Sequence, residues 1–140
     1  MSELKKPRGT LRRLIRNWAV PIGCGLLFLF LLKSVFFFGY VPSVSMEPAI
    51  SEGSFVFGVR MFAELERGDV VVFTHDNVLL VKRVAGIPGD FVDLGGKMTA
   101  VPEEHYYLLG DNLRESIDSR FWSEPFVAKT DIVAILPFVQ

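Results

Sequence analysis

The hydrophobic positions of the chain form two patterns, which meet near residue 40. Residues 18–40 are one long apolar run, WAVPIGCGLLFLFLLKSVFFFGY. About 20 helical residues, at about 1.5 Å rise each, span the roughly 30 Å hydrocarbon core of a bilayer. Trp18 and Tyr40 bracket the run as interfacial aromatic residues do. The pattern therefore predicts a transmembrane helix over residues 18–40.

Charge predicts the orientation of this helix. Residues 1–17 contain six Lys/Arg, so the positive-inside rule makes them a cytoplasmic segment. Residues 41–140 are then expected on the other side of the membrane. Lys33 interrupts the apolar run, but it lies near the far end, where its stem can extend to the interface.

A cleaved signal peptide is the alternative to an anchor. Its apolar core would be shorter, and a small-x-small cleavage site would follow it. No Ala-x-Ala motif follows the run, and cleavage at Ser43-Val44-Ser45 would remove the most informative loop of the chain. An anchor is therefore favoured.

Beyond residue 40 the apolar positions come in short runs separated by turn residues. The runs are rich in β-branched and aromatic residues, and RGD, IPGD, LGGK and LGDN predict turns between them. Six or so closely spaced strands are typical of a small antiparallel β barrel or sandwich. The predicted strands are residues 54–59, 69–73, 78–86, 90–94, 105–110 and 131–138.

Composition narrows the possible functions. Cys24 is the one cysteine, which excludes an intrachain disulfide and cysteine-cluster metal sites. Residues 1–33 carry seven Lys/Arg and one acid, whereas residues 34–140 carry eight Lys/Arg and fifteen acids. A body without excess positive charge argues against nucleic acid as a partner. The lipid bilayer is the expected partner, no metal or cofactor is expected, and the oligomeric state is left open.

The loop VPSVSMEPAI, residues 41–50, contains the candidate nucleophile Ser45. A nucleophilic serine needs a base, and histidine is the common choice. His75 lies in a predicted hairpin turn, and His105 follows two glutamates at the start of a strand. Both contexts are typical of polar surface residues.

Lys82 is the alternative base. Side chains alternate across a strand, so Lys82 shares one face of residues 78–86 with Val78, Leu80 and Val84. An exposed lysine, with a pKa near 10.4, is neutral in about one molecule in 2,500 at pH 7. Burial can lower this pKa by up to about 3–5 units, which would provide a neutral amine. The strand alone favours a lysine that extends to solvent from an edge; the serine loop and the polar segment 110–120 together reverse that balance.

Three segments in order resemble the type I signal peptidase family of membrane-bound Ser/Lys endopeptidases. They are PSVSMEP, RGDVVVF with VKRVAGIPGD, and GDNLRESIDSR. The resemblance covers most of residues 40–125. It implies a mostly antiparallel β domain, with preprotein signal peptides as substrates and small residues at the first and third positions before the cut. Pockets lined by residues such as Val44, Phe57 and Val84 are expected to select these small residues.

The resemblance also implies a role for individual residues. Ser45 is the expected nucleophile and Lys82 the general base. The Ser43 hydroxyl and the Ser45 N–H are the expected oxyanion hole.

A supporting network is implied around the lysine. The Ser116 hydroxyl is expected to orient the amine, and Asp118 and Arg120 are expected to form an ion pair. Asp111 is expected to join that network.

Three departures from the family pattern stand out. Leu113 precedes Arg114 where the family often has arginine directly after the asparagine, and Ala49 replaces a common threonine. Larger members insert a second β domain where this chain has only residues 95–105, so the chain resembles a near-minimal catalytic core.

Two alternatives to a general signal peptidase stay open at this point. One is a specialised peptidase that matures a single conjugation or secretion substrate. The other is a non-catalytic, membrane-tethered β scaffold. A bacterial inner (plasma) membrane is favoured over an organellar membrane.

Overall fold

The computed structural model describes residues 8–139, and the side chains of residues 17–139. The chain divides into two compact units, Met1–Ser34 and Val35–Gln140, which are described separately. Of the predicted cytoplasmic segment 1–17, residues 1–7 lie outside the described residues, and residues 8–17 form the first turns of the helix. The elements in order are α1 (Arg8–Val35), β1 (Phe36–Tyr40), β2 (Phe55–Val59), β3 (Val70–His75), β4 (Val78–Gly86), β5 (Phe91–Asp93), β6 (Met98–Ala100), β7 (His105–Leu109), β8 (Phe126–Ala128), a 3₁₀ turn η1 (Lys129–Asp131) and β9 (Ile132–Ile135).

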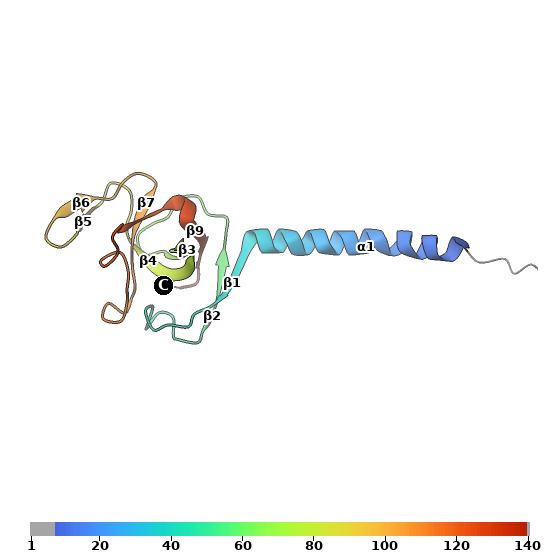
Figure 1. The fold of residues 1–140 in the computed structure, drawn as a ribbon, viewed down its shortest axis with the longest axis horizontal. Coiled ribbons are helices and arrows are strands. Elements are labelled where there is room, and N and C mark those ends of the chain that lie inside the picture. Colours follow the sequence, from blue (N-terminus) through green and yellow to red (C-terminus); the bar gives the residue numbers. More distant parts are fainter. Residues whose placement is uncertain (1–7, 140) are drawn as a thin grey trace, which may run out of the picture. The chain divides into compact units, whose positions relative to one another are not determined.

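Helix α1 is the N-terminal unit, coloured blue in Figure 1. Its stretch Asn17–Val35 is long and apolar enough to cross a membrane, and none of that stretch is buried within the protein. Nineteen residues at about 1.5 Å each give about 28 Å, close to the thickness of a bilayer core. Lys33 lies in the last turn, where a cation interacts favourably with the negative end of the helix dipole.

The helix ends five residues before the predicted boundary at Tyr40. Residues 36–40 form β1 instead, paired antiparallel with β2 from Phe36↔Val59 to Tyr40↔Phe55. The run Phe36-Phe37-Phe38 is apolar enough to extend a transmembrane segment, but aromatic residues also favour strands. Pairing with a distant strand decides between the two, and hydropathy along the chain does not contain that information.

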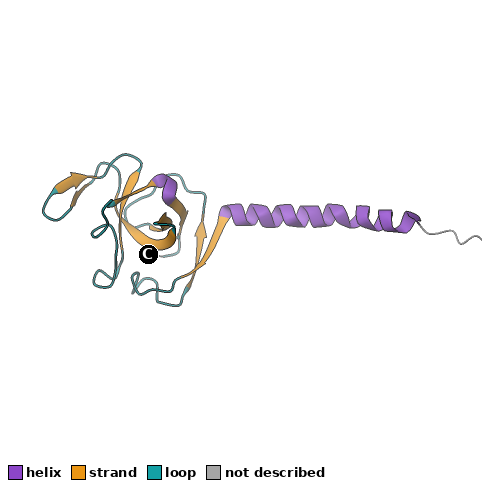
Figure 2. Ribbon diagram, in the orientation of Figure 1, coloured by secondary structure: helices purple, strands orange, loops and turns teal. Residues whose placement is uncertain are grey.

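The C-terminal unit is built on one seven-stranded antiparallel sheet in the order β1-β2-β9-β3-β4-β7-β8. Figure 2 shows this unit as strands joined by loops. The prediction of a mostly antiparallel β domain behind one N-terminal helix is confirmed. The six predicted strands correspond to β2, β3, β4, β5, β7 and β9. β1 and β8 are the two edges, so within residues 8–139 the sheet does not close into a barrel.

The core lies on both faces of β3. Val70 and Val72 belong to one buried cluster, whereas Val71 and Phe73 belong to a second. Alternate side chains of a strand point to opposite faces, so a strand covered on both sides is apolar at every position. This explains the continuous run VVVF at residues 70–73.

A separate two-stranded sheet, β5–β6, occupies the connection between β4 and β7. Figure 1 shows this hairpin standing out from the large sheet. Gly95 and Gly96, with φ of 66° and 92°, form its turn, a backbone conformation that glycine adopts without strain. The short segment in place of a second β domain is therefore a hairpin.

Removing a core aromatic side chain tests this packing. Phe73 is fully buried, so Phe73→Ala should lower the free energy of unfolding by about 3–5 kcal/mol, because transfer and cavity terms add. Phe91→Ala is the matched control: Phe91 is 68% exposed, and its loss should change stability by less than about 0.5 kcal/mol. Chemical denaturation of the full chain in detergent measures both. Equal effects would contradict the assignment of β3 to the core.

Candidate active site

The serine loop between β1 and β2 is anchored by its apolar residues. Val41, Met46 and Ile50 are buried in the cluster beside β3. The Ile50 N–H donates to the Met46 carbonyl at 2.8 Å, which tightens the turn after the serine. Ser45 is thereby held at the inner side of the loop, with 9% of its surface exposed.

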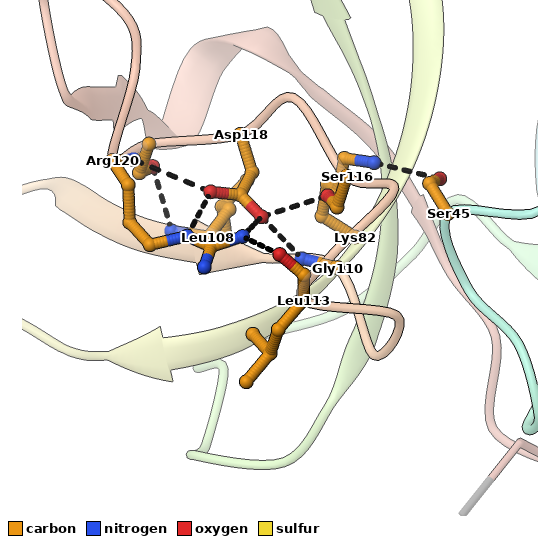
Figure 3. A network of polar contacts seen from close by, with 9 residues as sticks. Ser45, Lys82, Leu108, Gly110, Leu113, Ser116, Asp118 and Arg120 are labelled. Atoms are coloured by element: carbon orange, nitrogen blue, oxygen red, sulfur yellow. Dashed lines mark hydrogen bonds and ion pairs between the residues drawn. The ribbon is translucent and has the colours of Figure 1, made fainter.

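Lys82 reaches Ser45 from the middle of β4. Lys82 pairs with Val71 of the buried strand β3, and only 3% of the surface of Lys82 is exposed. Lys82 Nζ lies 2.7 Å from Ser45 Oγ, within hydrogen-bonding distance (Figure 3). The alternative of a lysine extending to solvent does not fit this burial. The structure thus brings together two side chains that are 37 residues apart in the sequence.

The surroundings lower the pKa of the Lys82 amine. The largest cause is burial, which disfavours the charged ammonium. The nearby carboxylate of Asp118 opposes this effect, the Arg120 guanidinium adds to it, and Asp111 opposes it weakly. The net effect increases the fraction of neutral amine, the form that can accept a proton.

Asp118 is the centre of the polar network beside the lysine (Figure 3). The fully buried carboxylate accepts hydrogen bonds from the Gly110 N–H at 3.0 Å, the Ser116 hydroxyl at 2.7 Å and Arg120 Nε at 2.8 Å. Burial raises the pKa of Asp118, but the bonds from Arg120, Gly110 and Ser116 outweigh it and leave the pKa lowered. The expected Asp118–Arg120 ion pair is present, so the buried carboxylate of Asp118 is not left without a counter-charge.

The Ser116 hydroxyl is buried and donates a hydrogen bond to Asp118. Its oxygen can therefore accept a hydrogen bond from a neighbouring amine. Among the described residues no hydrogen bond joins Ser116 to Lys82, so the orienting role of Ser116 stays a prediction.

Asp111 differs from the expectation that it joins the Asp118 network. Both of its oxygens bind Arg83, at 2.7 Å each, and Arg83 Nη1 donates to the Gly68 carbonyl at 2.7 Å. Arg83 follows Lys82 on the strand, so its side chain points to the opposite face. Asp111 follows β7, whose Leu109 pairs with Arg83, and it therefore meets the arginine. It acts on Lys82 only through its charge.

Gly110 and Asn112, which were not singled out from the sequence, connect the polar loop to the serine loop. The Asn112 N–H donates to the Ser45 carbonyl at 3.0 Å, and its side-chain amide donates to the Val44 carbonyl at 3.2 Å. A Cβ at Gly110 would lie 2.6 Å from the Ser45 carbonyl oxygen and would overlap Ser116. Only glycine allows this approach, and the Gly-Asp-Asn start of the segment GDNLRESIDSR is the feature of the sequence that points to these two residues.

The Ser43 hydroxyl lies beside the nucleophile candidate, 3.3 Å from Ser45 Oγ. Within the described part of the chain, no hydrogen bond is found for the Ser45 N–H. Both groups are thus available as donors at the same edge of the loop.

A hollow of about 320 Å³ opens in front of the two side chains. It is lined by residues 40–43, Ser45, residues 78–82, Glu115 and Ile117. The expected lining by Val44, Phe57 and Val84 is wrong. Val84 is buried in the core, because the positions of β4 before Lys82, rather than those after it, face the hollow. Phe57 lies on β2, where it packs on Phe36 of β1.

The two histidines lie in other surroundings. His75 stacks on Trp122 with ring centroids 4.1 Å apart, and His105 Nδ1 lies 2.8 Å from the Glu103 carbonyl oxygen. Neither histidine is bonded to Ser45 among the described residues. No group of three or more potential metal ligands is found in the described part of the chain.

Adding one methyl group at Gly110 tests the contact between the loops. Gly110→Ala should lower kcat/KM for peptide cleavage by about 10- to 100-fold, because displacement of a reacting group by about 1 Å can cost that much. Gly25→Ala is the matched control, since nothing lies within 4 Å of its new Cβ. Steady-state kinetics of both variants measure the effect, and full activity of Gly110→Ala would contradict the close packing of Ser45 and Ser116.

Comparison with known proteins agrees with this geometry. The model of the family described as signal peptidase, peptidase S26, matches residues 15–100 and 94–139. Signal peptidase I S of Bacillus subtilis is 27% identical in an alignment that covers 96% of each chain. Signal peptidase I of Bacillus licheniformis is 30% identical, covering 74% of this chain and 77% of its own. Mitochondrial inner membrane protease subunit 1 of Mus musculus is 36% identical over 56% of this chain and 54% of its own. The chain therefore belongs to the signal peptidase family, peptidase S26, and is a serine endopeptidase.

Proposed function

We propose that this chain removes signal peptides from exported preproteins, with Ser45 as the nucleophile and Lys82 as the general base. The observation that supports these roles is the buried amine of Lys82, 2.7 Å from the Ser45 hydroxyl. No metal or cofactor takes part in this chemistry.

The reaction begins with proton transfer to the lysine. Neutral Lys82 accepts the proton of the Ser45 hydroxyl while the oxygen attacks the scissile carbonyl. The resulting oxyanion accepts hydrogen bonds from the Ser45 N–H and from the Ser43 hydroxyl. One such donor contributes about 3 kcal/mol to transition-state stabilisation.

The same amine completes both half-reactions. Lys82 returns its proton to the leaving amine as the peptide C–N bond breaks, which leaves an acyl-enzyme on Ser45. It then takes a proton from water, whose hydroxide attacks the ester and releases the signal peptide with a new carboxylate. Lys82 finally protonates the Ser45 oxygen, so the enzyme returns to its starting state.

The neighbouring residues hold the amine in place and control its charge. Ser116, Asp118 and Arg120 form a hydrogen-bonded network beside it. The Arg83–Asp111 pair ties β4 to the loop after β7. We assign positioning roles to these residues, since none of them contacts the reacting hydroxyl.

Membrane attachment follows from the N-terminal sequence. We propose that residues 18–35 span a bacterial plasma membrane once, that residues 1–17 are cytoplasmic, and that residues 41–140 form the extracytoplasmic peptidase domain. The positive-inside rule supports this orientation. β1 follows the helix directly and exposes Phe38 and Tyr40, aromatic residues that suit a membrane interface.

The two alternatives have different standing. Membership of a peptidase family, together with the Ser45–Lys82 contact, disfavours a non-catalytic scaffold. Specialisation for one substrate is also not favoured, since the relatives named signal peptidase I resemble this chain over most of its length. Cleavage of several unrelated preproteins by the purified chain would distinguish a general peptidase from a dedicated one.

Alanine or methionine at the two central positions tests the mechanism. Ser45→Ala and Lys82→Met should each reduce preprotein cleavage by at least about 1,000-fold, because nucleophile and base act as a unit. Lys82→Met should fold at least as stably as the wild type, since it removes a desolvated amine and keeps the side-chain volume. Cleavage in detergent and thermal unfolding measure the two effects. Retained cleavage in either variant would reject the dyad.

The pH profile tests the state of the lysine. Only neutral Lys82 accepts a proton, so kcat/KM should fall as the pH is lowered through its pKa, which lies below the ordinary lysine value. The Arg120 charge lowers that pKa. Arg120→Gln should therefore move the acid limb to higher pH and reduce activity at neutral pH.

Arg67→Gln is the control for loss of one positive charge. Arg67 pairs with Asp90 at the surface, and it is not among the causes of the Lys82 pKa shift. The acid limb of the pH profile of kcat/KM for Arg67→Gln should coincide with that of the wild type. A limb that moves to lower pH in Arg120→Gln would contradict the assigned electrostatics.

A further inference from the structure

The wall of the hollow in front of Ser45 is mostly apolar, and charge on it is scarce. Residues 40–42 and 78–81 line it with aliphatic, proline and tyrosine side chains. Among the described lining residues, Lys82 is the one with a basic side chain and Glu115 the one with a carboxylate. Since the proposed mechanism uses neutral Lys82, the carboxylate of Glu115 is then the one formal charge among the described residues that line the hollow.

Glu115 is placed there by the local structure of the polar loop. Its N–H donates to the Asn112 carbonyl at 3.1 Å, which forms a turn directly after the contact with Ser45. The next residue, Ser116, is buried against Asp118. With Ser116 turned inward, Glu115 and Ile117 on either side of it face outward and reach the hollow.

The carboxylate is available to a substrate. Glu115 is exposed, and no salt bridge among the described side chains includes it. Two other acids of the same loop are paired, Asp118 with Arg120 and Asp111 with Arg83. Arg114, the residue before Glu115, is exposed, has no salt bridge among the described side chains and does not line the hollow. A single charge beside a low-dielectric wall produces a field that opposite charges approach and like charges avoid.

We infer that Glu115 is a specificity-determining residue, which favours substrates with a lysine or arginine close to the scissile bond and disfavours those with an acid there. This inference rests on the proposed function, because it assumes that the peptide lies in the hollow beside Ser45. The inference concerns the charge of the substrate residues that flank the small residues at the first and third positions before the cut. The size of the pockets does not select for that charge.

A charge series of peptides tests the inference with the full chain in detergent. Each peptide keeps small residues at the first and third positions before the cut, and carries Lys, Gln or Glu at one neighbouring position. The wild type should cleave the Lys peptide about two- to five-fold better in kcat/KM than the Glu peptide at one or more positions, the range of exposed ion pairs. The preference should shrink in about 0.5 M salt, because such pairs are screened.

Variants identify the carboxylate as the cause. E115Q should abolish the Lys-over-Glu preference, and E115K should reverse it. E103Q removes an exposed acid outside the hollow and should keep the wild-type preference. The Gln peptide provides an internal reference for each variant, so a general loss of activity is not mistaken for a change of specificity.

The outcomes separate the two proposals. A wild type that cleaves the peptides without regard to charge, or an E115Q variant that keeps the preference, overturns the role of Glu115 and leaves the proposed function intact. A wild type that cleaves none of the peptides and no preprotein overturns both.

Discussion

The burial of one amine against one hydroxyl is the interaction on which the rest of the structure depends. A charged ammonium in this position would lose its hydration without full compensation, so the site favours the neutral form. β4 places the lysine next to the buried strand β3, and the buried apolar residues of the serine loop fix the loop that carries Ser45. The same packing that stabilises the domain thus creates the base. The stability of the domain and the catalytic state of Lys82 therefore depend on the same contacts between β3, β4 and the serine loop.

The polar loop after β7 places a carboxylate near the amine and neutralises the charge of that carboxylate. Its carboxylate Asp118 lies near the amine but is held by Arg120, the Gly110 N–H and Ser116. An unpaired carboxylate would favour the ammonium form, whereas this neutralised group provides a fixed polar wall. Burial has the largest effect on the Lys82 pKa, and the Asp118–Arg120 pair adjusts it, so small changes in this pair should alter the proton transfer from Ser45.

Much of this arrangement was predictable from the sequence, for physical reasons. Period-two alternation placed Lys82 in an apolar column, and the six strands rich in β-branched residues were found with their turns. The parts that were not predictable depend on contacts between distant segments. β1 was assigned to the helix because three phenylalanines suit either state until β2 pairs with them. Asp111 was expected in the network of Asp118, but it binds Arg83, because the register of β7 on β4 decides which arginine it meets. The lining of the hollow also depends on which end of β4 the serine loop covers.

The β5–β6 hairpin has a consequence for how such enzymes diversify. It forms its own small sheet. A Cβ added at residue 95 or 96 of its glycine turn would have no neighbouring atom within 4 Å. A chain can grow there without disturbing the strands that carry the amine. Loops with closely spaced ends tolerate long additions at little entropic cost. This turn is accordingly a natural insertion point for a whole extra module, or for a reporter fused by design.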